Sequence, residues 1–413
     1  MALASLTSLN HHRNYRRFLI GQVFSALGTW VQTFATTWLI LDLTHSAVAV
    51  GVLALCQFLP FTFFGLFAGA VIDRFDPHRM VLATQSMLLC IAATLACLTL
   101  TGVIATWQIY TLSVIAGLVM VLDSPSRQAL TFALVGRDDL SAAVGLNTSV
   151  YSIGRVLGPA TGGLLVAAIG TGGCFVVNCV SFVPVIGALL LVRRDDLFSV
   201  PHPERISRNV LRGTMDSLSY VRHTPTVAVI LAAIFLLSTL SSNVNVLVPL
   251  LAKVTLHGGP ETFGLISACL GIGTMVGGLF AAARGKASFR GLLAGGAGMG
   301  IAELMIAVHA SILTAAILLF ALGTCYTLWT SNASSTLQLA APDHQQGRAV
   351  SLYYFAFLAG SPIGGWLAGE LVAAGGARLG FGVAGAAAIV TVSIALARLR
   401  VLERRCEPAQ LSL

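Results

Sequence analysis

Charged residues are scarce in this chain. Of its 413 residues, 10% are Asp, Glu, Lys or Arg and 56% are hydrophobic, whereas about a quarter of the residues in soluble globular domains are charged. Its apolar runs also lack the short alternating strands that build membrane-spanning barrels. The composition therefore excludes a soluble protein. It predicts an all-α membrane protein, because helices satisfy their own backbone hydrogen bonds within a bilayer.

Motifs of metal binding and catalysis are lacking as well. The eight cysteines have no CxxC spacing, and nearly all fall in apolar stretches, where they are expected to be small packing residues. The nine histidines lie mostly in loops or at the ends of these stretches, and neither HExxH nor GxSxG occurs. We therefore expect no disulfide framework, no metal site, no cofactor and no enzymatic activity.

Apolar stretches make up most of what the chain contains. A hydrocarbon core of about 30 Å is crossed by about 20 helical residues. Twelve stretches are long enough, and they lie at 18–41, 47–72, 80–101, 106–126, 144–169, 173–192, 226–250, 261–283, 289–308, 311–336, 350–373 and 379–398. The first has too long an apolar run for a cleaved signal peptide and no small-residue cleavage site after it, so we expect it to remain as a helix.

Basic residues are distributed unevenly around these stretches. With an even number of spans, 21 of the 24 Lys and Arg lie on the side of both termini, Lys253 and Arg378 lie on the other, and Arg155 lies within the membrane. This asymmetry predicts that both termini are cytoplasmic. The net charge of +8 is then a topology signal. We expect the chain to be surrounded by the lipid bilayer and to bind no nucleic acid.

The longest polar segment, residues 193–225, divides the chain near its middle. We predict an N-terminal six-helix half at 1–192 and a C-terminal six-helix half at 226–413. Residues 65–68 and 278–281 both read Gly-Leu-Phe-Ala, so the halves are expected to be pseudo-symmetric repeats. The segment between them is either a cytoplasmic loop carrying an amphipathic helix that lies on the membrane surface or a linker without fixed structure.

A glycine-rich motif lies in the fifth apolar stretch. It consists of Gly145, Gly154, Gly158, Pro159, Gly162 and Gly163. At 3.6 residues per turn, Gly154, Gly158 and Gly162 form one stripe, so that neighbouring helices can approach closely. The spacing resembles the antiporter motif on the fifth transmembrane helix of major facilitator superfamily exporters. Ordinary glycine packing between membrane helices is the alternative.

A second resemblance lies in the loop after the second stretch. The residues concerned are Gly69, Asp73, Arg74 and Arg79. They are similar to the superfamily motif Gly-xxx-Asp-Arg-x-Gly-Arg-Lys, whose Asp caps helix 11 and latches the two halves in the outward-facing state. The resemblance implies a conformational latch, since a carboxylate is favoured at a helix N-terminus. Asp76 and Pro77 depart from the motif, and a basic loop with incidental acids is the alternative.

Charged residues inside the apolar stretches are costly and are candidates for function. Asp123 and Arg127 lie four apart on one helix face, and Arg155 lies beside Gly154. The proton affinity of a carboxylate depends on nearby charge and on burial, so this group is expected either to load and release a proton or to form a static ion pair. Glu303, about midway along its span, is the other candidate for proton coupling, and a role in packing or a snorkelled position is the alternative.

Superfamily helices 1, 4, 7 and 10 line the substrate cavity. On three of these helices, the candidate lining residues are Gln22, Trp30, Gln32, Asn243, Asn245, Trp329 and Asn332. Aromatic and apolar walls with scattered amides suit a large amphipathic ligand. Such residues also pack between membrane helices, and both interpretations stay open.

The run from Asp123 to Ala129, followed by Asn147 and the glycine motif, is similar to the branch of the superfamily that includes the enterobactin exporter and macrolide efflux proteins. The resemblance implies a twelve-helix major facilitator fold, a monomer, and export of small amphipathic molecules across the cytoplasmic membrane by proton antiport. A siderophore or metabolite exporter, an importer, and a non-transporting sensor or assembly factor are the alternatives.

Overall fold

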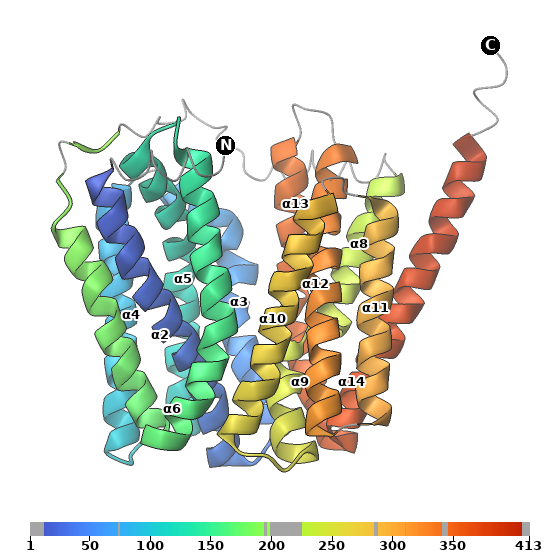
Figure 1. Cartoon of the computed structure of the whole chain (residues 1–413), viewed down its shortest axis with the longest axis horizontal. Helices are drawn as coiled ribbons and strands as arrows, with labels where there is room; N and C mark the ends of the chain where they lie inside the picture. The colour runs from blue at the N-terminus through green and yellow to red at the C-terminus, as the bar shows by residue number, and fades with distance from the viewer. Residues whose placement is uncertain are drawn as a thin grey trace. The chain divides into compact units, whose positions relative to one another are not determined.

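The computed structural model describes residues 12–72, 75–193, 196–198, 225–284, 288–309, 311–340 and 346–406, and these form helices and connections without a strand. The helices (Figure 1) are α2 (Arg13–Thr44), α3 (Ala47–Ile72), α4 (Pro77–Leu100), α5 (Thr106–Val135), α6 (Leu140–Leu190), α8 (Pro225–Leu240), α9 (Val244–Leu250), the π-helical η3 (Leu251–Thr255), α10 (Pro260–Arg284), α11 (Phe289–Val308), α12 (Ile312–Ala340), α13 (Gln346–Ala359) and α14 (Ser361–Cys406). The predicted all-α fold is confirmed for these residues.

Within the described ranges, ten helical segments are long and apolar enough to cross a membrane. Two of the predicted spans run together in α6. The predicted span 350–373 is divided between α13 and α14, and its second part shares α14 with the span 379–398. Each long helix is interrupted by glycine: Gly170 has φ 71° and ψ 174°, and Gly376 has φ 75° and ψ 176°. Glycine adopts positive φ at no steric cost, so the chain can turn between two spans at these points. Twelve membrane helices stay a prediction.

Contacts group the chain into two compact units. The first holds α2 to α6 together with Gly258–Ala268, which include the start of α10, and the second holds α8, α9, η3 and the chain from Cys269 onward. Most of the predicted boundary segment, residues 193–225, lies outside the described residues, and so does the position of the predicted amphipathic helix. The division into two six-helix halves therefore stays a prediction.

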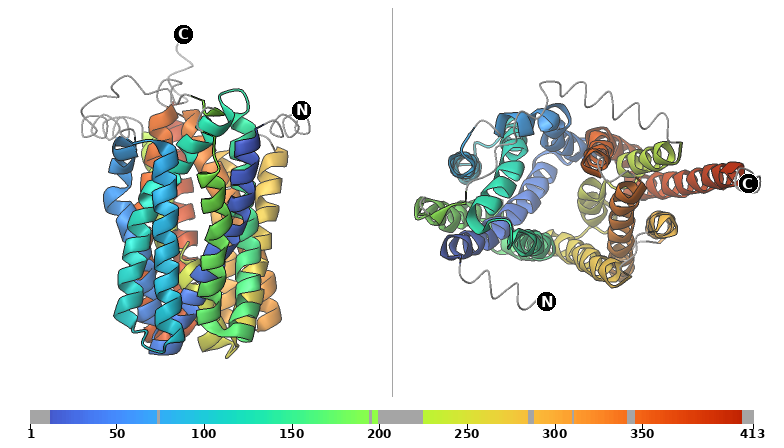
Figure 2. Two further views of the ribbon diagram at one scale, coloured as in Figure 1. Left: turned by 90° about the vertical axis from the view of Figure 1, so that its left-hand side faces the viewer. Right: turned by 90° about the horizontal axis from the view of Figure 1, so that it is seen from above.

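In the first unit, α2 lies along α6, and α4 packs against α5 and α6 (Figure 2). Glycines of α2 allow this close approach to the part of α6 that follows Gly170. A Cβ added to Gly21 would lie 2.6 Å from the Cα of Val185, and one added to Gly28 would lie 2.5 Å from the Asn178 side-chain oxygen. The backbone of α2 therefore lies directly against its neighbour, and this fixes the position of its polar residues.

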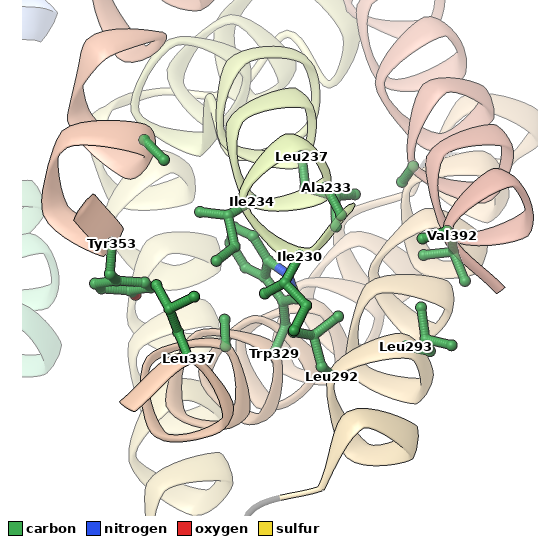
Figure 3. Close-up of a cluster of buried hydrophobic side chains, with 14 of the residues drawn as sticks. Ile230, Ala233, Ile234, Leu237, Leu292, Leu293, Trp329, Leu337, Tyr353 and Val392 are labelled. Carbon is green, nitrogen blue, oxygen red and sulfur yellow. The ribbon is translucent and has the colours of Figure 1, made fainter. Parts of the chain in front are cut away.

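In the second unit, α11 packs against α12 and α14, and α8 packs against α13 and α14. Their apolar faces meet in a cluster of buried side chains that includes Ile234, Leu237, Trp329 and Val392 (Figure 3). Because lipid tails are as apolar as these side chains, close van der Waals packing is what stabilises such contacts between membrane helices. This cluster forms the core of the second unit.

The predicted span 226–250 is broken in the structure. α8 ends at Leu240 and α9 begins at Val244. The three residues between them are short and polar, and such side chains compete with helical hydrogen bonds. The Asn243 amide donates to the Thr239 carbonyl oxygen over 2.7 Å, and the Ser242 hydroxyl donates to the Leu237 carbonyl oxygen over 3.2 Å. The sequence therefore breaks the helix in the middle of an apolar span.

Candidate functional site

An ion pair is buried in the first unit. The Arg127 Nε donates to Asp123 Oδ2 over 2.5 Å, and the side chains of Asp123 and Arg127 are 0% and 12% exposed. α5 places both residues on one face because they are four positions apart. Removing one partner of such a pair leaves the other charge uncompensated, at a cost of about 3–5 kcal/mol. The two residues thus act as one unit.

The second oxygen of Asp123 is held by α4. Asp123 Oδ1 accepts hydrogen bonds from the Thr84 hydroxyl at 2.6 Å and from Gln85 Nε2 at 2.9 Å. Both residues are buried. Together with Arg127 they give the buried carboxylate three donors, and hydrogen bonds to an ionised group are stronger than those between neutral groups. Sequence reasoning missed Thr84 and Gln85; the signal that could have found them is an adjacent polar pair inside an apolar span.

The far side of Arg127 reaches α2 and α6. Its Nη1 donates to Gln22 Oε1, and its guanidinium lies 5.9 Å from the centre of the Tyr151 ring, within cation–π range. Within the described structure, the Gln22 amide nitrogen is buried and has no hydrogen-bond partner. Gln22, a predicted cavity residue, therefore belongs to the charge network. Side chains from α2, α4, α5 and α6 meet at this pair.

A second polar group supports the same junction. Thr131 lies one turn after Arg127, and its hydroxyl accepts a hydrogen bond from Asn147 Nδ2 over 3.0 Å. The Tyr15 hydroxyl donates to the Ala143 carbonyl oxygen over 2.9 Å and lies 3.3 Å from Asn147 Oδ1. These contacts tie α2, α5 and α6 together beside the ion pair. Polar contacts of three helices therefore adjoin the ion pair.

The glycine stripe of α6 faces α2. A Cβ on Gly154 would lie 2.9 Å from Trp30 Cδ1, one on Gly158 would collide with Trp30 Cβ, and one on Gly162 would lie 3.0 Å from Phe34 Cγ. Trp30, a predicted cavity residue, therefore packs against the stripe. Only the small glycine side chain fits this approach.

The other side of the glycine motif differs from the stripe. A Cβ on Gly163 would lie 2.9 Å from the Cα of Gly264, at the start of α10, whereas Gly145 has open space around it. Pro159 is partly buried within α6, and its carbonyl oxygen lies 2.9 Å from the Cβ position of Gly264. The motif thus has close neighbours at four of its five glycines. Its role in antiport stays a prediction.

The predicted latch is only partly described. Gly69 lies in α3, whereas Asp73 and Arg74 lie outside the described residues. Arg79 is exposed, with its Nε 3.8 Å from Asp76 Oδ2. The departure from the family motif has a local explanation: Asp76 caps α4, accepting from the His78 backbone N–H over 2.9 Å, and Pro77 occupies the first helical turn. The latch itself stays a prediction.

The remaining candidates lie in several places. Arg155 is partly buried beside Gly154 on α6, and Asn245 is exposed on α9. Gln32 Oε1 accepts from the Asn178 amide over 2.7 Å. In the second unit, the Trp329 side chain is fully buried in the apolar cluster, and Asn332 Oδ1 accepts from the Ser288 backbone N–H, at the start of α11, over 2.9 Å. Their role in binding a substrate stays a prediction.

Glu303 is fully buried on α11, where its Oε2 accepts a hydrogen bond from Ser241 over 2.7 Å. It lies in the second unit, apart in the chain from the Asp123 network. The structure therefore brings Asp123, Arg127 and Gln22 together and places Glu303 in a different group.

Comparison with known sequences finds relatives that match nearly the whole chain. A sequence profile of the family described as "Transmembrane secretion effector" matches residues 4–411. The multidrug efflux pump Tap of Mycolicibacterium fortuitum is 26% identical over 401 residues, which are 94% of this chain and 97% of that protein. The enterobactin exporter EntS of Citrobacter koseri is 26% identical over 389 residues, which are 89% of this chain and 88% of that protein.

Solved structures share the fold. The crystal structure of the nucleoside transporter NupG superposes with a TM-score of 0.75 at 11% sequence identity, and the match covers 94% of this chain and 99% of that chain. At this identity the likeness shows the fold alone. The fold is that of a multi-pass membrane transporter, which agrees with the long apolar helices.

Proposed function

Because the chain belongs to the transmembrane secretion effector family of major facilitator transporters, we propose that it exports small amphipathic, drug-like molecules across the cytoplasmic membrane in exchange for protons. Its relatives and its fold are those of transporters, and the relatives include efflux proteins. The proposal adds the substrate class, the direction of export and the coupling ion.

The buried pair of Asp123 and Arg127 carries this proposal. A charged group within an apolar helix bundle is energetically costly unless it has a complete set of partners. Such groups are therefore candidates for function. This pair has partners on three further helices, namely Gln22, Thr84 and Tyr151. A change in its charge therefore acts on the packing of four helices at once.

In the proposed cycle, a proton from external water binds Asp123 and cancels its charge. The neutral acid no longer forms an ion pair with Arg127, so the guanidinium can leave the carboxyl group while it keeps its contacts with Gln22 and Tyr151. Helices α4 and α5 then lose a restraint, and the carrier changes conformation. Release of the proton to cytoplasmic water restores the pair. Arg155 is the proposed second cation of this network.

The proposed architecture has twelve spans in two six-helix repeats, with both termini cytoplasmic and a monomer as the working unit. Internal packing supports the repeat. In the first unit, Gly158 of α6 lies against Trp30 of α2; in the second, Gly364 lies against Thr239 at the end of α8. Each contact joins the fifth predicted span of a half to its first. Such repeats are common in secondary transporters.

Substrate class rests on the relatives. Tap is a multidrug efflux pump and matches nearly the whole chain, which favours drug-like molecules. EntS, an enterobactin exporter, matches at the same identity over slightly less of the chain. Export of a siderophore is therefore the second candidate, and the two can be separated only by direct assay.

The test is a substrate panel in a strain that lacks its own efflux pumps. Cells that express the protein should accumulate less ethidium than cells with an empty vector, and a protonophore should abolish the difference. Export of a siderophore into the medium without any effect on ethidium or other drugs would favour the second candidate. Protonophore-insensitive efflux would contradict proton coupling.

A further inference from the structure

A second acidic group is buried at the broken helix of the second unit. Glu303 of α11 is fully buried, and its Oε2 accepts a hydrogen bond from the Ser241 hydroxyl over 2.7 Å. Ser241 is itself fully buried and is the first of the three residues that separate α8 from α9. The carboxyl group and the break in the helix are therefore in direct contact.

The other oxygen of Glu303 has no hydrogen-bond partner among the described residues, and no described basic side chain forms an ion pair with it. A buried carboxylate with one donor and no cation is strongly disfavoured, whereas the neutral acid avoids that cost. In this respect Glu303 differs from Asp123, which has three donors, one of them an arginine.

The elements around Glu303 carry few titratable groups. α8 and α9 have none, and α12 has only Cys325 and Tyr326. α14 packs against α11 through Gly300 and Gly385, and its stretch 379–397 has neither charged nor titratable residues. On the chain segments that adjoin the site, the basic residues are Arg290 and His309 at the two ends of α11, Arg378 on α14 and Lys253 in η3. Arg290 and Lys253 are more than three helical turns along the chain from Glu303 and Ser241, respectively, and His309 and Arg378 are exposed.

The break beside Glu303 can rearrange. The backbone N–H groups of Ser241 and Ser242 both donate to the Leu237 carbonyl oxygen, at 3.0 and 3.1 Å, so α8 ends in a tight turn. Leu237 belongs to the apolar cluster of Figure 3. Interrupted membrane helices provide hinges and ion sites in transporters because their backbone can change partners. Gly360 and Gly364 pack closely against Thr239, which is the second-last residue of α8 before the break.

We propose that Glu303 is a second proton-binding site of this transporter, occupied in the conformation described here, and that rearrangement of the α8–α9 break opens it to water. The inference rests on the proposed proton-coupled export. The step transfers one proton between the carboxyl oxygen and water and changes no other bond. Ser241 positions the carboxyl group and senses its state through the hydrogen bond to Oε2.

Infrared spectroscopy of the full-length protein in lipid tests whether Glu303 holds a proton. At neutral pH the wild type should show the C=O stretch of a protonated carboxyl group, and Glu303→Gln should lack it. Glu370→Gln is the matched control, since it makes the same change at an exposed acid of α14, and the band should remain. Ser241→Ala should shift the band, because it removes the hydrogen bond to Oε2. A spectrum that is unchanged by Glu303→Gln would overturn the proposal.

Proton counting then separates a working site from a static buried acid. In proteoliposomes with an enclosed pH-sensitive dye, Glu303→Gln should move fewer protons per molecule of ethidium than wild type and Glu370→Gln. An unchanged ratio, or loss of the infrared band when sodium replaces an organic cation at constant pH, would overturn the proposal. Wild-type efflux without proton movement would instead refute the proposed antiport, whereas the infrared band still reports on Glu303.

Discussion

Replacing Gly158 with alanine adds one methyl group where α6 lies against α2. The new Cβ would collide with Trp30 Cβ and lie 3.3 Å from the Trp30 Cα and carbonyl carbon. These atoms cannot rotate away, so the helices must separate. Overpacking of this kind costs about 1–3 kcal/mol, a change of about 5- to 150-fold in an equilibrium between packed and separated states.

Gly145→Ala is the matched control for this substitution. Both positions lie in α6, and at each of them the change from glycine to alanine lowers the free energy of the helical conformation by about 1 kcal/mol. Gly145 has no atom within 4 Å of its added Cβ, so only the helical gain remains there. The thermal-unfolding midpoint of purified Gly158→Ala should therefore fall below that of Gly145→Ala, and its ethidium efflux should be reduced. Equal midpoints and equal efflux would refute the reasoning.

A double-variant series refines this test. At Gly154 the added Cβ would meet Trp30 Cδ1 at 2.9 Å, which is an atom of the indole ring. Trp30→Ala should therefore relieve the damage of Gly154→Ala and give a favourable interaction energy between the two positions. It should not relieve Gly158→Ala, because alanine keeps the Cβ that causes that collision. Relief of both variants to the same degree would contradict the contacts described.

Further predictions concern the ion-pair site, a helix cap and the topology. Thr84→Val removes a donor from Asp123 and should cost about 1–3 kcal/mol of stability, measured as a lower unfolding midpoint. Thr84→Ser keeps the hydroxyl and should have the wild-type midpoint. Equal midpoints for the valine and serine variants would contradict the assigned hydrogen bond. Asp76→Ala removes the α4 cap and should cost about 1 kcal/mol, and Asp76→Asn should retain most of the stability. Cysteines placed at Thr44 and Gly259 should react with a membrane-impermeant thiol reagent added outside intact cells, and labelling only after lysis would contradict the proposed topology.

Hydropathy alone predicts much of this fold. The starts and ends of α3, α4, α10 and α11 lie within a few residues of the predicted spans, because a helix in lipid must be apolar along most of its length. The interruption at Gly170 also falls between two predicted spans. The break after Leu240 was not predicted, although the run Ser241, Ser242 and Asn243 is a recognisable signal in an apolar span.

The candidate site was predictable only where the contacts are local. Helical spacing alone brings Asp123 and Arg127 together, and it also aligns the glycine stripe. The partners on neighbouring helices could not be predicted in this way. Thr84 meets Asp123 because α4 packs against α5, and Trp30 meets Gly158 because α2 packs against α6. The whole set of packed helix faces decides which helices are neighbours and in what register they pack. The sequence of a single span does not contain this information.

The central claim is that protons drive export through Asp123. Its most direct test is uphill ethidium efflux from proteoliposomes with an imposed proton gradient, comparing wild type with Asp123→Asn and with the exposed-acid control Glu370→Gln. Asp123→Asn should fold, retain downhill exchange and lose gradient-driven uphill efflux, whereas the control should behave as wild type. Uphill efflux at the wild-type rate in Asp123→Asn, still abolished by a protonophore, would contradict the claim.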